Sequence, residues 1–276
     1  MKPIELYRYS AKELEFSDCA EFEAQCIFED LLELDKNKVL LSDFEVSPSD
    51  IDLVSDAVKR RKLGEPLQYI LGKWDFYDMS FFVGKGVLIP RPETELLVDF
   101  ALEKLTDIKN PVIYDLCAGS GCIGLAIAYH VKNSTVFLFE KEKAAFEYLK
   151  RNKEKYDIKN AVLINDDIFT VDLSQYPCAD MLLSNPPYIE SDEIDILQRE
   201  VLFEPRTALD GGKDGLSFYR CIAERWTDKV KSGGYIAIEC GEEQSGGIIK
   251  IFSGRYTEKN TILDFNNIDR IVTFRI

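Results

Sequence analysis

Apolar residues recur first at helical spacing and then, beyond about residue 73, at the spacing of strands. In the first part, Phe22, Cys26 and Leu31 fall on one face of a predicted helix, and turn residues are sparse. The run SPSD at 47–50 has the pattern of a helix N-terminus, with a capping serine, a first-turn proline and an acid. We therefore expect residues 1–73 to form a small all-helical domain that docks the substrate.

Residues 74–90 alternate between apolar and polar side chains, which predicts a β-hairpin linker with its turn at Gly84-Lys85-Gly86. From residue 91 onward, short and uniformly apolar runs alternate with helical stretches of about ten residues, which is typical of a parallel sheet covered on both faces. Residues 91–276 are therefore expected to form a doubly wound α/β domain. The predicted strands lie at 112–117, 136–140, 161–165, 181–185 and 235–240, and an antiparallel pair closes the tail.

The charge balance narrows the class of function. Thirty-four Lys and Arg against 49 Asp and Glu give a net charge of −15, and so acidic a surface disfavours binding along extended nucleic acid. The seven cysteines contain no C-x-x-C pair and the only histidine is His130, so no metal site and no His-dependent nucleophile are expected. Reduced cysteines and the lack of a signal-like or membrane-length apolar run lead us to expect a cytoplasmic protein without membrane contact.

A glycine-rich turn follows the first predicted strand of the α/β domain. Residues 115–124 read DLCAGSGCIG, and Glu140 ends the next strand, where an acid can accept hydrogen bonds from a ribose. Gly119-x-Gly121-x-x-Gly124 also fits the dinucleotide fingerprint, but Asp115 would face the pyrophosphate of NAD and oppose its binding. A cationic ligand without phosphate, S-adenosylmethionine (SAM), suits that acid better.

The second motif, Asn185-Pro186-Pro187-Tyr188, ends the predicted strand 181–185. The prolines stop strand pairing and hold their carbonyls rigidly. If the Asn185 side-chain carbonyl and the Pro186 backbone carbonyl each accept one N–H of an amide or exocyclic amine, the nitrogen lone pair is directed at an electrophilic methyl group. Tyr188 offers a face on which a planar group can stack. The alternative interpretation is an ordinary strand-end turn.

Further segments along the chain form a distinctive set together with these two motifs. The full set is PLQYILG at 66–72, VLIPRPETELL at 87–97, the turn at 115–124, SNPPYI at 184–189, FEPRTAL at 203–209, and Gly215-Leu216. Through these segments, nearly the whole chain resembles the release factor glutamine methyltransferases, the PrmC/HemK family. The Asn-Pro-Pro-Tyr motif alone is shared with adenine-N6 methyltransferases, whereas the proline-arginine-proline and Phe-Glu-Pro-Arg segments narrow the likeness to this family.

This resemblance implies a helical N-terminal domain, a hairpin linker and a seven-stranded methyltransferase domain. It also implies SAM-dependent methylation of the glutamine amide in the Gly-Gly-Gln loop of class I peptide-chain release factors, and we expect the enzyme to be a monomer. Many family members have Gly in place of Cys117 and an aromatic in place of Ile168. By motif, the methionine part of SAM is held by Cys117, Ala118, Gly119, Ser120 and Gly121, with Asp115 and Asn185 beside it; the ribose by Glu140; the adenine by Asp167 and Ile168; and the glutamine by Asn185, Pro186, Pro187 and Tyr188.

Other interpretations stay open at this point. The rival enzyme is an adenine-N6 methyltransferase, although the chain has no basic groove or base-flipping domain. A catalytically idle SAM-binding scaffold and a nicotinamide oxidoreductase come next. Residues 93–95 (ETE) either begin a helix or line the cleft, and Arg206 either folds over the substrate or forms an ordinary ion pair. The basic run KRRK at 59–62 is either a solvated helix end or a contact for ribosomal RNA or an acidic partner.

Overall fold

The computed structural model describes residues 1–276 and divides the chain into two compact units. The first unit comprises Met1–Lys73 together with Gln198–Phe203, and the second comprises Trp74–Leu197 together with Glu204–Ile276. Six residues from the middle of the second unit's sequence therefore belong to the N-terminal unit. No helix combines the length and the apolar character that a membrane span requires.

The N-terminal unit is built from five helices: α1 (Pro3–Glu13), α2 (Ala20–Leu32), α3 (Lys36–Leu41), α4 (Pro48–Lys62) and α5 (Leu67–Leu71). Ser47 caps α4 as its sequence predicts. The predicted face of α2 is wrong, because Ala24, Ile27 and Phe28 are buried whereas the side chain of Phe22 is 58% exposed. The inward face also carries Glu23, which Arg61 of α4 draws into the interior.

The basic run 59–62 is not a free cationic patch. Arg61 is buried and its guanidinium donates to both carboxylate oxygens of Glu23, at 2.9 and 2.8 Å, and to Oε1 of Glu200, at 2.6 Å. Arg60 pairs with Glu65, and Lys62 pairs with Glu13. Interpreting the run as a solvated helix end is thus wrong for Arg61, which ties Gln198–Phe203 to the N-terminal helices.

The predicted hairpin exists, but its turn lies elsewhere. Strands β1 (Lys73–Phe76) and β2 (Met79–Phe82) pair around a turn at Tyr77-Asp78, where Tyr77 has a φ of 58°. Gly84 and Gly86 follow β2 in a separate turn, which a hydrogen bond from the Val87 amide to the Gly84 carbonyl closes at 3.2 Å and in which Gly86 has a φ of 101°. A Cβ on Gly84 would lie 2.3 Å from the Tyr148 hydroxyl, and one on Gly86 would lie 2.8 Å from Cβ of Ala144.

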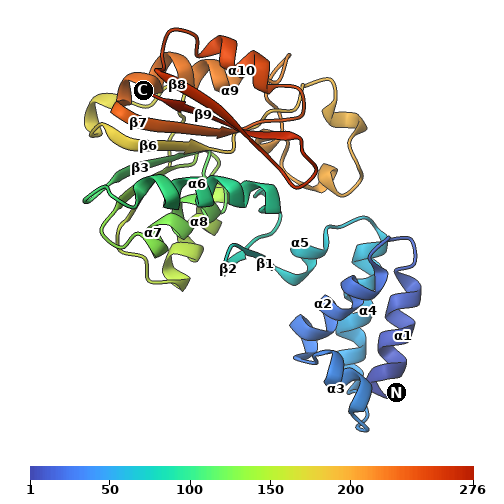
Figure 1. Cartoon of the computed structure of the whole chain (residues 1–276). Helices are drawn as coiled ribbons and strands as arrows, with labels where there is room; N and C mark the ends of the chain where they lie inside the picture. The colour runs from blue at the N-terminus through green and yellow to red at the C-terminus, as the bar shows by residue number, and fades with distance from the viewer. The chain divides into compact units, whose positions relative to one another are not determined.

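The second unit contains a seven-stranded sheet in the order β5-β4-β3-β6-β7-β9-β8 (Figure 1). The first five of these strands run parallel, and β9 pairs antiparallel with both β7 and β8, which confirms the predicted doubly wound fold and its closing pair. The strands are β3 (Val112–Leu116), β4 (Thr135–Phe139), β5 (Ala161–Ile164), β6 (Ala179–Ser184), β7 (Val230–Glu239), β8 (Glu258–Leu263) and β9 (Asp269–Arg275).

Helices cover both faces of this sheet (Figure 1). Helices α6 (Glu95–Leu105), α7 (Cys122–His130) and α8 (Lys143–Lys155) contribute to one apolar core, and α9 (Ser217–Cys221) and α10 (Ser245–Ile251) contribute to the other. The helical stretch at 217–229 is divided, because α9 continues as a π-helix at Ile222–Trp226 and a 3-10 helix at Thr227–Lys229.

The topological switch point lies between β3 and β6. These strands are parallel neighbours with Leu116 opposite Ser184, and the Ser184 hydroxyl donates to the Leu116 carbonyl at 2.8 Å. The carboxyl ends of the two strands therefore place the residues that follow them, Cys117 and Asn185, at the same edge of the sheet. Open α/β folds bind ligands at this position.

Candidate active site

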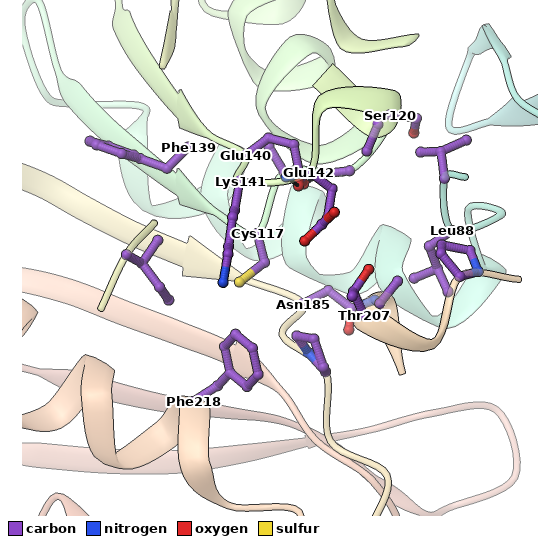
Figure 2. A pocket seen from close by; sticks show the side chains of 18 of the residues that line it. Leu88, Cys117, Ser120, Phe139, Glu140, Lys141, Glu142, Asn185, Thr207 and Phe218 are labelled. Carbon is purple, nitrogen blue, oxygen red and sulfur yellow. Dashed lines mark hydrogen bonds between the residues drawn. The ribbon is translucent and has the colours of Figure 1, made fainter. Parts of the chain in front are cut away.

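A cavity of about 290 Å³ opens at the carboxyl ends of β3, β4 and β6. Figure 2 shows Cys117, Glu140 and Asn185 around it, with Phe218 on another side. Four of the predicted site residues, Asp115, Gly121, Pro186 and Tyr188, are not part of its wall. The predicted residues that do line it are Cys117, Ala118, Gly119, Ser120, Glu140, Asp167, Ile168, Asn185 and Pro187.

The turn after β3 depends on left-handed backbone at three positions. Cys117, Gly119 and Gly121 have φ values of 61°, 55° and 84°. A Cβ on Gly121 would lie 2.3 Å from Cδ1 of Leu149, so that glycine permits α8 to pack closely. A Cβ on Gly119 would meet only Val87, at 4.0 Å, so the left-handed backbone is the reason for glycine there. Cys117 also has a left-handed backbone, which is strained because Cys117 carries a side chain.

Asp115 supports the turn from behind. Its Oδ2 accepts a hydrogen bond from the Gly124 amide at 2.9 Å, its Oδ1 has no partner, and the side chain is fully buried. Burial, together with the nearby negative charge of Glu140, raises the pKa of Asp115 to about 7 although the Gly124 amide favours the ionised form. The side chain that was expected at the strand mouth therefore acts here on the backbone of α7, not on the cavity surface.

Glu140 follows β4 and faces the cavity (Figure 2). One carboxylate oxygen accepts from the Gly119 amide at 2.8 Å and the other accepts from the Glu142 amide at 2.7 Å. Burial raises the pKa of Glu140, and these amide donors limit the rise. The carboxylate is thus fixed in place by backbone groups, beside the glycine turn.

The opposite part of the wall is largely apolar. Phe169 and Phe218 both line it and make an edge-to-face contact with ring centroids 5.1 Å apart, and Ile168 lies next to them in sequence. The Lys141 ammonium pairs with Oδ2 of Asp167 at 3.0 Å. Aromatic surface is therefore available to a planar ligand although position 168 itself is isoleucine.

Asn185 is held by a residue that the sequence left undecided. Its side-chain amide donates to Oγ1 of Thr94 at 3.1 Å, and the Thr94 hydroxyl donates to Oε2 of Glu239 at 2.6 Å. Thr94 lies in the 3-10 turn Pro92–Thr94, lines the cavity and is buried. Burial raises the pKa of Glu239 to about 7, against the Thr94 hydrogen bond and the charge of Arg270.

The two residues after Pro186 differ in position. Pro187 lines the cavity, whereas the ring of Tyr188 packs against the core on the α9 side of the sheet, close to Gly241. The backbone carbonyl of Tyr188 accepts from the Gln244 side chain at 2.8 Å. The predicted stacking role of Tyr188 would thus require its ring to leave this position.

Part of the segment 203–209 lines the cavity, and Arg206 forms the ion pairs that one of its two interpretations predicts. Pro205, Thr207 and Ala208 line the wall, and Arg206 forms ion pairs with Asp195 and Asp210 at 3.0 and 3.4 Å. Buried Glu204 accepts from the Ile89 amide at 3.0 Å and pairs with Arg91. These contacts fix the segment to residues 87–97.

The charge of the wall suits a cation. It carries five carboxylates against two cations, and one of those cations, Lys141, is already paired with Asp167. The other, Arg91, is paired with Glu204. The carboxylates are Glu140, Glu142, Asp166, Asp167 and Asp210.

Comparison with known proteins agrees with this geometry. Residues 5–72 match the family model described as PrmC N-terminal domain, and residues 93–213 match that of the methyltransferase small domain. Among solved structures, the fold is similar to the hMettl16 catalytic domain in complex with MAT2A 3'UTR hairpin 6, at a TM-score of 0.58 and 12% identity, over 89% of this chain and 88% of that one. It is also similar to the T. thermophilus 16S rRNA N2 G1207 methyltransferase, at a TM-score of 0.51 and 15% identity, over 74% of this chain and 49% of that one.

Sequence relatives are more specific. The chain is 38% identical to the release factor glutamine methyltransferase of Thermodesulfovibrio yellowstonii, over 91% of this chain and 90% of that one. It is 34% identical to that of Fusobacterium nucleatum, over 91% and 72%, and 33% identical to that of Clostridium botulinum, over 92% of each. With the two matched domains and the cavity at the switch point, these identities show that the chain belongs to the release factor glutamine methyltransferase family.

Proposed function

We propose that this chain transfers the methyl group of SAM to the side-chain amide nitrogen of the glutamine in the Gly-Gly-Gln loop of a class I release factor. One observation carries the proposal: Asn185 and Pro187 lie on the wall of the same cavity as Cys117, Gly119 and Glu140. A glutamine held at the Asn-Pro-Pro-Tyr motif would therefore be next to whatever occupies the glycine turn.

The cavity wall fits SAM in three respects. The excess of carboxylates suits a ligand with cationic sulfonium and amino groups. The Glu140 carboxylate is placed to accept hydrogen bonds from a ribose, and Ile168, Phe169 and Phe218 offer an apolar, partly aromatic surface to an adenine. At the turn, the backbone of Cys117 and Gly119 can approach the methionine part without obstruction by a side chain at Gly119.

The chain's own residues act on the nucleophile. An amide nitrogen is a poor nucleophile because its lone pair is delocalised into the carbonyl. We assign the Asn185 side-chain oxygen and the Pro186 backbone oxygen as acceptors for the two N–H groups of the glutamine, so that its nitrogen faces the cavity. SAM, when bound, supplies an electrophilic methyl group: an N–C bond forms, the S–C bond breaks, and S-adenosylhomocysteine leaves. The methylated amide then loses a proton to water, so no general base is required.

The remaining parts of the proposal concern the partner. The helical unit Met1–Lys73 has the size of a docking module, and we assign it the recognition of the release factor outside the methylated loop. We further infer that the enzyme acts as a monomer in the cytoplasm, where its free cysteines stay reduced.

A labelling experiment tests the function. The protein is incubated with SAM carrying a labelled methyl group and either a purified release factor or duplex DNA. Label on the release factor is expected at the glutamine of its Gly-Gly-Gln loop, and a release factor with Asn at that position serves as the control. If the label appears on DNA adenine instead, this proposal is wrong and the chain acts as an adenine-N6 methyltransferase.

A further inference from the structure

Two hydrogen bonds in series hold the side chain of Asn185 at the wall of the cavity. Its Nδ2 donates to Oγ1 of Thr94 at 3.1 Å, and the Thr94 hydroxyl donates to Oε2 of Glu239 at 2.6 Å. Thr94 and Glu239 are each only 1% exposed. Glu239 does not line the cavity, so its carboxylate is available to Thr94 and not to a ligand.

The chemistry of a hydroxyl gives this series a direction. A threonine hydroxyl has one proton, and an ionised carboxylate can only accept. Because Thr94 gives its proton to Glu239, its oxygen can only accept from Asn185. Of the two ends of an amide, only the NH₂ group can donate. The Asn185 Oδ1 atom must therefore point away from Thr94.

We propose that Thr94 and Glu239 are positioning residues that fix the Asn185 amide with Oδ1, not Nδ2, presented to the substrate. The inference rests on the proposed function, in which Oδ1 accepts an N–H of the glutamine amide. With the amide turned by 180°, Nδ2 would meet another NH₂ group, and two donors cannot form a hydrogen bond. The series Glu239–Thr94–Asn185 thus selects the productive one of two orientations that have nearly the same shape.

The fold brings these three residues together from separate elements. Asn185 follows β6, and Glu239 ends the neighbouring strand β7, whose Ile238 is opposite Ser184. Thr94 comes from the 3-10 turn Pro92–Thr94, which Pro90 and Pro92 make rigid. The side chains at a strand end and in a proline-rich turn have little freedom, which is what a positioning role requires.

Kinetics of matched variants test the proposal at pH 8.5, where the Glu239 carboxyl is ionised. Thr94→Val keeps the shape but removes the hydroxyl, and we expect kcat on the release factor to fall roughly 10- to 100-fold, because the amide then loses its fixed orientation. The affinity for SAM, measured by calorimetry, should change less than about twofold. Thr94→Ser restores the hydroxyl and should recover most of the lost kcat.

A second buried threonine provides the control for a general loss of stability. The Thr227 hydroxyl donates to the Ala223 carbonyl within its own helical segment and Thr227 does not line the cavity, so Thr227→Val should leave kcat unchanged. The proposal is overturned if folded Thr94→Val keeps wild-type kcat, if it loses SAM affinity in proportion to kcat, or if Thr227→Val loses as much activity as Thr94→Val.

A spectroscopic measurement tests the orientation without any activity assay. In ¹⁵N-labelled enzyme, the side-chain NH₂ of Asn185, assigned by its loss in Asn185→Ala, should give one signal pair with slowed solvent exchange. Glu239→Gln keeps the size of the side chain but can donate to Thr94, so it should populate both orientations and give two pairs. A single unprotected pair in the wild type refutes the series. If the wild type does not methylate the release factor at all, the proposed function fails while this measurement still decides the orientation.

Discussion

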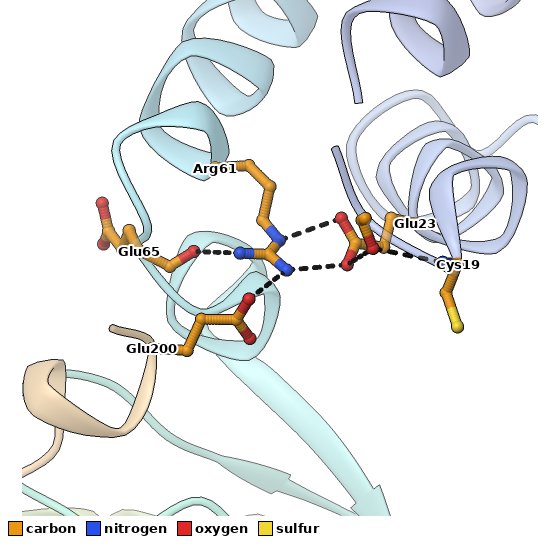
Figure 3. A network of polar contacts seen from close by, with 6 residues as sticks. Cys19, Glu23, Arg61, Glu65 and Glu200 are labelled. Carbon is orange, nitrogen blue, oxygen red and sulfur yellow. Dashed lines mark hydrogen bonds and ion pairs between the residues drawn. The ribbon is translucent and has the colours of Figure 1, made fainter. Parts of the chain in front are cut away.

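The buried ion triad of the N-terminal unit leads to a prediction whose size can be worked out from the structure. Arg61 joins Glu23 and Glu200, as Figure 3 shows, and the three side chains differ in exposure: 4% for Arg61, 9% for Glu23 and 49% for Glu200. In Arg61→Met, the apolar stem remains but the Glu23 carboxylate is left buried without its partner. Removing one member of a buried pair costs about 3–5 kcal/mol of unfolding free energy.

The same reasoning predicts small effects for two matched variants. Glu200→Gln breaks only the half-exposed pair and should cost at most about 1 kcal/mol. The double variant Arg61→Met, Glu23→Leu replaces the buried pair by apolar groups and should recover most of the stability that Arg61→Met loses, because neither buried charge remains. The three variants therefore separate the desolvation of Glu23 from the attraction between the charges.

Native-state hydrogen exchange, read by mass spectrometry on peptides of α2 and α4, is the suitable assay. Where exchange occurs by unfolding of this unit, a loss of about 3–5 kcal/mol raises the exchange rate roughly 10²- to 5 × 10³-fold. Peptides from β3 and β6 in the second unit serve as the internal reference and should keep their rates. If Arg61→Met changes the opening free energy of α2 and α4 by less than about 1 kcal/mol, the reasoning about buried charge is wrong.

Three further predictions concern the cavity. Asn185→Ala should lower the methylation rate about 30- to 1000-fold, equivalent to roughly 2–4 kcal/mol. The unfolding free energy should fall by only about 1 kcal/mol, because one neutral hydrogen bond to Thr94 is lost. Normal turnover by the folded variant would exclude the assigned mechanism. Glu140→Ala should weaken SAM binding by about 2–4 kcal/mol in calorimetry, since hydrogen bonds to a charged acceptor disappear; unchanged affinity would remove Glu140 from the ribose. The pKa of Asp115 is about 7 in the folded protein against 3.8 for the free group, so the native state holds the extra proton and stability falls as pH rises from about 4 to 7. In urea unfolding, we therefore expect the unfolding free energy of Asp115→Asn to rise by roughly 2 kcal/mol relative to that of the wild type between pH 5.5 and 8. A difference in unfolding free energy that does not change with pH would contradict the assignment.

Local pattern was sufficient for the architecture and for the position of the cavity. Short apolar runs such as those at 112–117 and 181–185, separated by helical stretches, are typical of buried parallel strands, and the glycine turn and the double proline mark where these two end. Parallel pairing of these strands then places Cys117 and Asn185 together, which is why nine of the thirteen predicted site residues line one cavity.

The sequence could not predict features that depend on contacts between residues far apart in the chain. The partners of Thr94 lie 91 and 145 positions away, so nothing near residues 93–95 distinguishes a helix start from a wall of the cavity. Likewise, Glu23 and Arg61 are separated by 38 positions, so the local pattern does not show that Glu23 lies on the inward face of α2 while Phe22 is exposed. Gly84 and Gly86 do form a turn, but the sequence does not show that Tyr77-Asp78 closes the hairpin before it, nor that Tyr148 and Ala144 approach the two glycines.

The membership of Gln198–Phe203 in the N-terminal unit has a consequence for the order of synthesis. Although the five helices are complete after residue 71, the carboxylate of Glu200 reaches Arg61 only after almost three quarters of the chain has been made. During translation, the N-terminal helices therefore lack the ion pair with Glu200 until β3, β4, β5 and β6 have been synthesised. A gene fragment cut at residue 73 would likewise encode this unit without one of its own pieces, and its stability on its own would understate that of the same helices in the whole enzyme.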